Sequence, residues 1–95
     1  VQFLTAAEGG RATPVFQGYS PNHNFGDPES REMQMGRFEL MEQQQLAPGQ
    51  TAVVTICFDG AANLAELIHP GRQWRVQEGG QLVAIGKVLE VVQTT

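Results

Sequence analysis

The sequence has little positive charge, a single cysteine and no long apolar run. Its 95 residues carry six Lys and Arg against ten Asp and Glu, a net charge of −4. Binding of nucleic acid through phosphates normally needs a basic face, so this balance excludes a DNA partner and weakens any RNA surface. A lone cysteine rules out an internal disulfide and predicts a reducing compartment, hence the cytoplasm. No apolar run approaches the roughly 20 residues of a membrane helix, so we expect no membrane partner.

Glycine and proline divide the chain at short intervals, with 11 Gly and 5 Pro. Turn residues at this spacing leave strands of ordinary length and no room for a long helix. Only Ala61–Leu67 has a run of good helix formers, and a short helical turn and an irregular loop both stay open for it. The length predicts a single domain over residues 1–95.

Apolar and polar residues alternate between these turns, as in half-buried strands. The pattern of Arg37–Leu40 turns Phe38 and Leu40 inward, and in Arg72–Gln77 the inward pair is Trp74 and Val76. The segment Thr51–Phe58 is apolar on both faces, so we expect it to be buried on both sides.

The first and last strands are expected over Val1–Ala6 and Gln81–Val92. About six short antiparallel strands must protect their edges, and a closed barrel or a small sandwich does so at this length. Gly86 marks a bend in the last strand of the kind that turns a barrel corner. We therefore predict an all-β protein, a small closed six-stranded antiparallel β-barrel.

No pattern typical of an enzyme or of a metal site occurs. His23, His69 and Cys57 lie far apart without the spacing of metal ligands, so no metal and no cofactor are expected. Cys57 lies among apolar strand residues, where a thiol behaves as a small core residue. Lys87 is the sole lysine and follows one glycine inside a strand, which is no phosphate-binding loop. The sequence predicts a protein that is not an enzyme.

Two glycine turns are candidates for binding. Glu8–Arg11 reads as a hairpin turn whose glycines supply positive φ, in preference to an anion cradle of backbone amides. Glu78–Gln81 reads as a second hairpin turn without an arginine. For both turns we therefore prefer a structural role to a role in binding.

The loop Gly18–Gly26 combines polar and aromatic residues with a proline, as loops that contact partners do. We expect Phe16 and Phe25 to fill the barrel interior. Two readings stay open for the more polar members of the loop, contact with a partner or exposure to solvent. These members are Tyr19, Asn22 and His23.

The order of these segments carries a family resemblance. They are Glu8–Phe16, Gly18–Pro21, Phe25, Pro48–Gln50, Trp74–Gly80 and Gly86. Their order and spacing resemble the C-terminal domain of translation elongation factor Tu over nearly the whole chain. The family pattern opens with Glu-Gly-Gly-Arg-His-Thr-Pro-Phe-Phe and continues with Gly-Tyr-Arg-Pro. The resemblance implies a six-stranded antiparallel barrel that helps hold the T-stem of aminoacyl-tRNA and packs against a GTPase domain. It also implies a contact with the nucleotide-exchange factor. The GTP chemistry of elongation factor Tu belongs to a different domain of that protein.

The departures from the family pattern remove positive charge. Ser20 replaces the arginine of Gly-Tyr-Arg-Pro, and the segment 27–32 is longer and more acidic than its family counterpart. Glutamines stand where the family has arginines near the end, at Gln73, Gln77 and Gln81. Because each lost cation removes a phosphate partner, we expect a non-catalytic module that docks on a protein, with tRNA contact as the alternative. The candidate binding residues are Gly10, Arg11, Thr13, Tyr19, Asn22, His23, Gln77, Glu78 and Gly79.

Overall fold

The chain folds almost wholly into short strands. The computed structural model describes residues 1–26, 33–40, 44–58 and 68–92. The elements are β1 (Gln2–Phe3), the 3-10 turn η1 (Ala6–Glu8), β2 (Val15–Phe16), β3 (Asn22–Asn24), β4 (Gln34–Glu39), β5 (Gln45–Leu46), β6 (Thr55–Phe58), β7 (Gln73–Glu78) and β8 (Gln81–Lys87). The predicted all-β class is confirmed. The segment Ala61–Leu67 lies outside the described residues.

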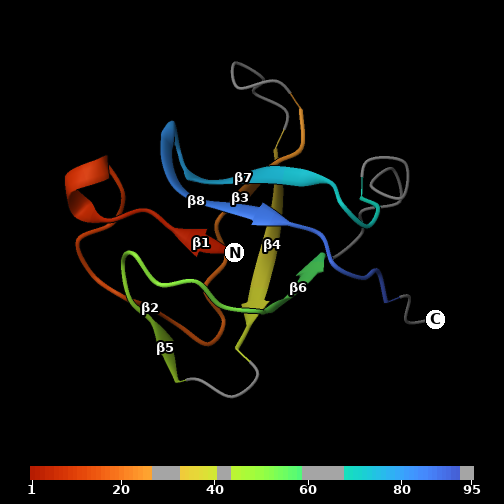
Figure 1. Cartoon of the computed structure of the whole chain (residues 1–95), viewed down its shortest axis with the longest axis horizontal. Coiled ribbons are helices and arrows are strands. Elements are labelled where there is room, and N and C mark those ends of the chain that lie inside the picture. The colour runs from red at the N-terminus through yellow and green to blue at the C-terminus, as the bar shows by residue number, and fades with distance from the viewer. Residues whose placement is uncertain (27–32, 41–43, 59–67, 93–95) are drawn as a thin grey trace.

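Six strands form one curved sheet in the order β1-β8-β7-β3-β4-β6, and β2 and β5 form a separate ribbon (Figure 1). Every pair of strands is antiparallel. Strand β3 is central, since it pairs with β4 on one side and with β7 on the other. Its residues are therefore confined between two neighbours.

The six-stranded sheet is not closed, and the closed barrel is a wrong prediction in this respect. Strands β1 and β6 are its two edges. β1 is linked to the stretch before β6 by an isolated bridge from Gln2 to Thr51, and by a 2.9 Å hydrogen bond from the Phe3 amide to the Gln50 carbonyl. The chain then leaves the ladder, and Val53 is 66% exposed. The continuous strand expected over Thr51–Phe58, buried on both sides, is thus also wrong.

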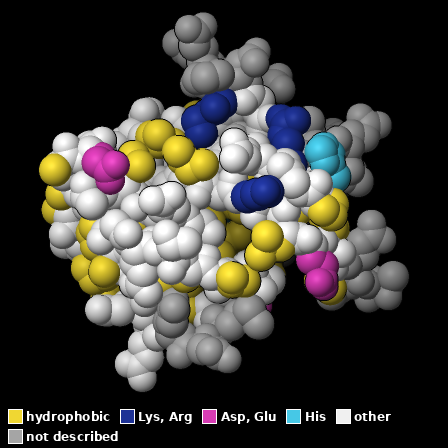
Figure 2. Space-filling model, viewed as in Figure 1, with side chains coloured by type: hydrophobic (Ala, Val, Ile, Leu, Met, Phe, Trp, Pro, Cys, Tyr) yellow, Lys and Arg dark blue, Asp and Glu magenta, His cyan; other side chains and the backbone are white. Residues whose placement is uncertain are grey.

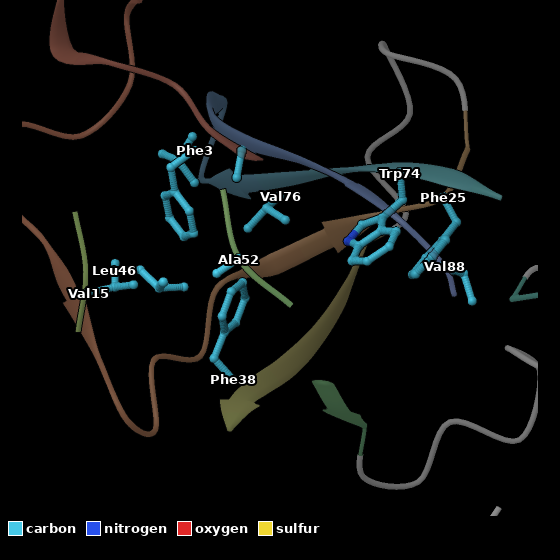
Figure 3. Packing of buried hydrophobic residues seen from close by; sticks show 11 residues of the cluster. Phe3, Val15, Phe25, Phe38, Leu46, Ala52, Trp74, Val76 and Val88 are labelled. Atoms are coloured by element: carbon cyan, nitrogen blue, oxygen red, sulfur yellow. The ribbon is translucent and has the colours of Figure 1, made fainter. Parts of the chain in front are cut away.

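The core lies between the curved sheet and the β2–β5 ribbon (Figure 3). Phe38 of β4 and Val76 of β7 are fully buried, as their alternation predicts, and Leu46 of β5 joins them from the ribbon. Phe25 is buried as expected. Phe16 is not: in β2 its neighbour Val15 takes the inward position, and Phe16 is 56% exposed.

Gly86 is needed for a close approach between β8 and β7. It lies opposite Trp74, and a Cβ atom at Gly86 would come within 2.5 Å of the indole ring. No heavier residue fits beneath the ring. The glycine expected to bend the strand thus accommodates an aromatic side chain.

A register shift between Val76 and Gln77 interrupts the β7–β8 ladder. Such an irregularity breaks the two-residue alternation of side chains. Gln77 follows the buried Val76 yet is itself buried. The alternation that turns Trp74 and Val76 inward puts Gln77 on the opposite face, which is wrong, whereas Gln73 on that same expected face is exposed, as is Gln81.

The N-terminal turn is not a hairpin. Thr5 caps the 3-10 turn η1 reciprocally with Glu8: the Glu8 amide donates to the Thr5 hydroxyl, and the Thr5 amide donates to the Glu8 carboxylate. These hydrogen bonds lower the pKa of Glu8. Gly9 ends the turn with a φ of 92°, so the expected positive φ is confirmed for Gly9, whereas Gly10 does not adopt one. The hairpin turn that does form is the one at Gly79, between β7 and β8.

Candidate binding site

The two Glu-Gly-Gly turns, distant in sequence, meet at one end of the molecule. The side-chain amide of Gln81 donates to the carbonyls of Gly9 at 3.0 Å and of Gly10 at 3.1 Å. Gly10 lies close to Leu4, whose carbonyl oxygen would be 2.7 Å from a Cβ atom at Gly10. The contact brings the turn after η1 against the start of β8, which places Arg11 beside β7.

Glu78, the last residue of β7, binds two side chains from the N-terminal part of the chain. Its carboxylate accepts hydrogen bonds from the Arg11 guanidinium and from the Tyr19 hydroxyl. Arg11 also donates to the Thr13 carbonyl at 3.2 Å and to the Thr13 hydroxyl at 3.0 Å. Its guanidinium carbon lies 5.3 Å from the centre of the Tyr19 ring, within the range of a cation–π contact. The structure thus brings together four of the predicted site residues.

The electrostatics of this cluster are those of a satisfied ion pair. The side chains of Arg11 and Glu78 are 23% and 31% exposed. Partial burial of Tyr19, together with its hydrogen bond to Glu78, raises the pKa of the phenol well above its usual range. Tyr19 therefore remains a neutral donor at physiological pH. The cluster ties the N-terminal part of the chain to the end of β7.

An open depression of about 420 Å³ lies beside the ion pair, lined by Arg11 and residues 13–19. Phe16 presents a mostly exposed ring there. Pro14 adds a second rigid apolar surface, and Gln17 and Thr13 add polar groups. An exposed aromatic ring bordered by polar groups is typical of a surface that binds another macromolecule. The sequence predicted Phe16 in the interior. The one signal of its exposure is that adjacent strand residues face opposite sides, so an inward Val15 turns Phe16 outward.

His23 does not belong to this surface. It is fully buried, with its Nδ1 atom 3.0 Å from the Trp74 indole nitrogen and its Nε2 atom 3.1 Å from the Gly36 carbonyl. A contact with a partner, one of the two readings of the sequence, is wrong for this residue, and so is exposure to solvent. The confinement of β3 between β4 and β7 explains its burial.

Three further candidates surround the hairpin without joining the cluster. Asn22 is half-buried and lies opposite Gln77 in the β3–β7 ladder. Gln77 is buried and accepts a 3.0 Å hydrogen bond from the Asn24 side chain, so it is a structural residue. Gly79 is exposed at the tip of the β7–β8 turn.

The remaining described arginines also donate to protein acceptors. Arg72 donates to the Phe25 carbonyl and Arg75 to the Gly26 carbonyl. Arg37 lies 3.4 Å from the Glu39 carboxylate. Figure 2 shows Lys and Arg side chains gathered over β7 and β8. Arg31 and the acidic segment 27–32 lie outside the described residues.

Cys57 lies on β6 opposite Arg37 and is half-buried. Desolvation and the nearby Glu39 raise the pKa of its thiol, which disfavours the reactive thiolate.

Within residues 1–26, 33–40, 44–58 and 68–92, no group of three or more His, Cys, Asp and Glu side chains is placed to hold a metal ion. Over the same residues, the structure contains no helix with the length and apolar character needed to cross a membrane. A scan against models of known protein families finds none that matches the chain.

Proposed function

We propose that this chain is a non-catalytic binding module, related to the C-terminal barrel of elongation factor Tu, that docks on a protein partner. The docking surface is the depression beside the Arg11–Glu78 ion pair, with the exposed Phe16 ring as its anchor. A partner that offers an apolar side chain to Phe16 and Pro14, with polar groups around it, would fit this surface. A translation factor is the partner class that the family resemblance suggests.

The observation that carries this proposal is the use of the arginine side chains. Each of the four arginines among the described residues already donates to a protein acceptor: Arg11, Arg37, Arg72 and Arg75. A phosphate would have to compete with Glu78 for Arg11 and with Glu39 for Arg37, whereas Arg72 and Arg75 donate to backbone carbonyls and carry further N–H groups. A surface of neutral polar groups around an aromatic ring suits a protein better.

The relation to the elongation-factor barrel is part of the proposal. It is supported by the six antiparallel strands of the main sheet and by the contact of β1 with the stretch that precedes β6. The amide of Ala52 donates to the Val1 carbonyl at 2.9 Å, two residues beyond the Gln50 bond. We propose that the sheet is an incompletely closed version of that barrel, opened where the chain leaves the ladder at residues 52–54.

The test is a binding titration of the full chain against a purified elongation-factor-type GTPase and, separately, against tRNA. We expect saturable binding to the protein, weakened about tenfold or more by Phe16→Ser, since buried aromatic anchors dominate interface energies. Leu89→Ser is the matched control, because Leu89 is 65% exposed but lies outside the depression. Equal losses for the two variants, or binding to tRNA alone, would contradict the proposal.

Contact with tRNA is the second candidate, and the Lys and Arg side chains gathered over β7 and β8 favour it (Figure 2). Lys87 is exposed and lies opposite Gln73 in the β7–β8 ladder. Gln73 is two positions before Arg75 on β7. If this face binds tRNA, affinity will fall steeply with salt and Lys87→Ala will weaken it. No mobility shift of tRNA at low salt would remove this candidate.

A further inference from the structure

His23 is among the fully buried residues of the described part of the chain. It lies on the central strand β3 and is 0% exposed. Its ring is surrounded by aromatic rings, with centroids 5.9 Å away for Phe38, 5.1 Å for Phe58 and 6.3 Å for Trp74. A histidine in such a place can keep its hydrogen bonds only if both ring nitrogens find partners.

Its two hydrogen bonds fix the proton on one nitrogen. The indole N–H of Trp74 can only donate, so the Nδ1 atom of His23, 3.0 Å away, must accept. The other nitrogen, Nε2, then carries the proton and donates to the Gly36 carbonyl at 3.1 Å. Both bonds exist together only while the imidazole is neutral.

No counter-ion lies against this ring among the residues that the structure describes. The described groups that contact it are Gly36 and Phe38 from β4, Phe58 from β6 and Trp74 from β7. None of these groups titrates or carries charge. Burial lowers the pKa of His23 to about 4, with the Gly36 carbonyl acting weakly in the opposite direction.

We propose that protonation of His23 acts as an acid-operated release within the sheet. It breaks the hydrogen bond between His23 and Trp74 and separates β3 from β7. Protonation would place a second N–H on Nδ1, facing the indole N–H at hydrogen-bond distance. Two donors cannot share that bond, and the new charge would lie among aromatic rings without a counter-ion. The strand contact between β3 and β7 must then loosen for water to reach the ring.

The sign of the effect follows from the two pKa values. The unfolded chain takes up the His23 proton near pH 6.5, whereas the folded chain resists it until about pH 4. The contribution to stability is therefore fully present above the unfolded pKa and is lost as the pH falls from about 6.5 to 4. Between pH 7 and pH 5 the folded-to-unfolded ratio should fall about 20-fold from this group.

The experiment uses Trp74, the sole tryptophan, as the reporter. Denaturant unfolding is followed by Trp74 fluorescence at pH 7 and pH 5 in the wild type, in His23→Gln and in His69→Gln. A glutamine at position 23 keeps an acceptor and a donor but does not titrate in this range. His69 is the other histidine and is exposed, so its variant is the matched control.

We expect a roughly 20-fold loss in the wild type and in His69→Gln, and less than about threefold in His23→Gln. The same pH dependence in all three proteins would overturn the proposal. If His23→Gln does not fold, ¹⁵N chemical shifts of the wild-type imidazole decide instead. A neutral His23 protonated at Nε2 at pH 5 in the folded protein supports the release, and ordinary titration near pH 6.5 overturns it.

Discussion

Two polar clusters tie β7 to earlier parts of the chain, and they differ in almost every physical respect. The inner one joins Trp74 to His23 through neutral groups in a dry aromatic environment. The outer one joins Glu78 to Arg11 and Tyr19 through charged groups that remain partly exposed. They lie only four residues apart along the same strand.

The difference teaches where polar groups add to stability. A buried hydrogen bond contributes modestly when made, but leaving one partner unsatisfied is costly because water cannot replace it. Breaking a partly exposed ion pair lowers the free energy of unfolding only a little, since solvent and salt screen its charges. We therefore expect the inner cluster to govern stability and pH response, and the outer one to govern binding.

The largest expected effect comes from filling the space under the Trp74 ring. Gly86→Ala places a methyl group within 2.7 Å of three ring carbons, which cannot move without disturbing the His23 bond. We expect a loss of about 3 kcal/mol in the free energy of unfolding, measured by denaturant titration. Gly80→Ala is the control, since nothing lies within 4 Å of a Cβ atom there. Similar losses for the two variants would show that the close approach is unimportant.

Removing the inner hydrogen bond is expected to have the next largest effect. Trp74→Phe keeps an aromatic ring but leaves the Nδ1 atom of His23 without its donor. We expect a loss of about 2 kcal/mol in the free energy of unfolding, followed by circular dichroism because the fluorophore is gone. Combined in a double-mutant cycle with His23→Phe, which has no acceptor for the indole N–H, it should show a coupling energy of about 1 kcal/mol. Additive losses would mean that the bond is not made in solution.

The outer cluster should respond less to loss of its hydroxyl. Tyr19→Phe removes the donor to Glu78 and keeps the ring against Phe38, whose centroid is 5.3 Å away. Because Tyr19 is half-buried, we expect a loss of about 1 kcal/mol by thermal or chemical unfolding. A loss as large as that of Trp74→Phe would erase the distinction between the two clusters.

The smallest effect is expected for the outer cation. Arg11→Ala should lower the free energy of unfolding by about 0.5–1 kcal/mol, and less in about 0.5 M salt, because the pair is partly exposed. Arg37→Ala is the matched control, since its pair with Glu39 is more exposed and longer at 3.4 Å. A larger loss for Arg37→Ala, or no change with salt, would contradict this assignment.

Alternation in the sequence predicted the inward positions of Phe38, Trp74 and Val76, because Phe38 lies on a regular ladder and the other two precede the register shift in theirs. It failed at Gln77, since a register shift leaves no mark in the polar and apolar pattern. It also failed at the sheet edges, where departure of the chain from the ladder depends on tertiary contacts rather than local preference.

The candidate site was predicted in its members more than in its arrangement. Arg11, Thr13, Tyr19 and Glu78 were singled out from turns and family resemblance, but their convergence joins residues 67 positions apart. His23 was singled out as a polar member of the loop Gly18–Gly26 and is a core residue instead. A polar residue between two asparagines carries no signal that its strand will be enclosed on both sides.

The side-chain amide of Gln81 couples the local opening of two turns. It holds the carbonyls of Gly9 and Gly10, so the turn after η1 cannot separate from the β7–β8 hairpin without losing both bonds. Neutral amides respond to neither acid nor ionic strength. Backbone amides in the two turns should therefore exchange through one shared opening, with protection factors that change together.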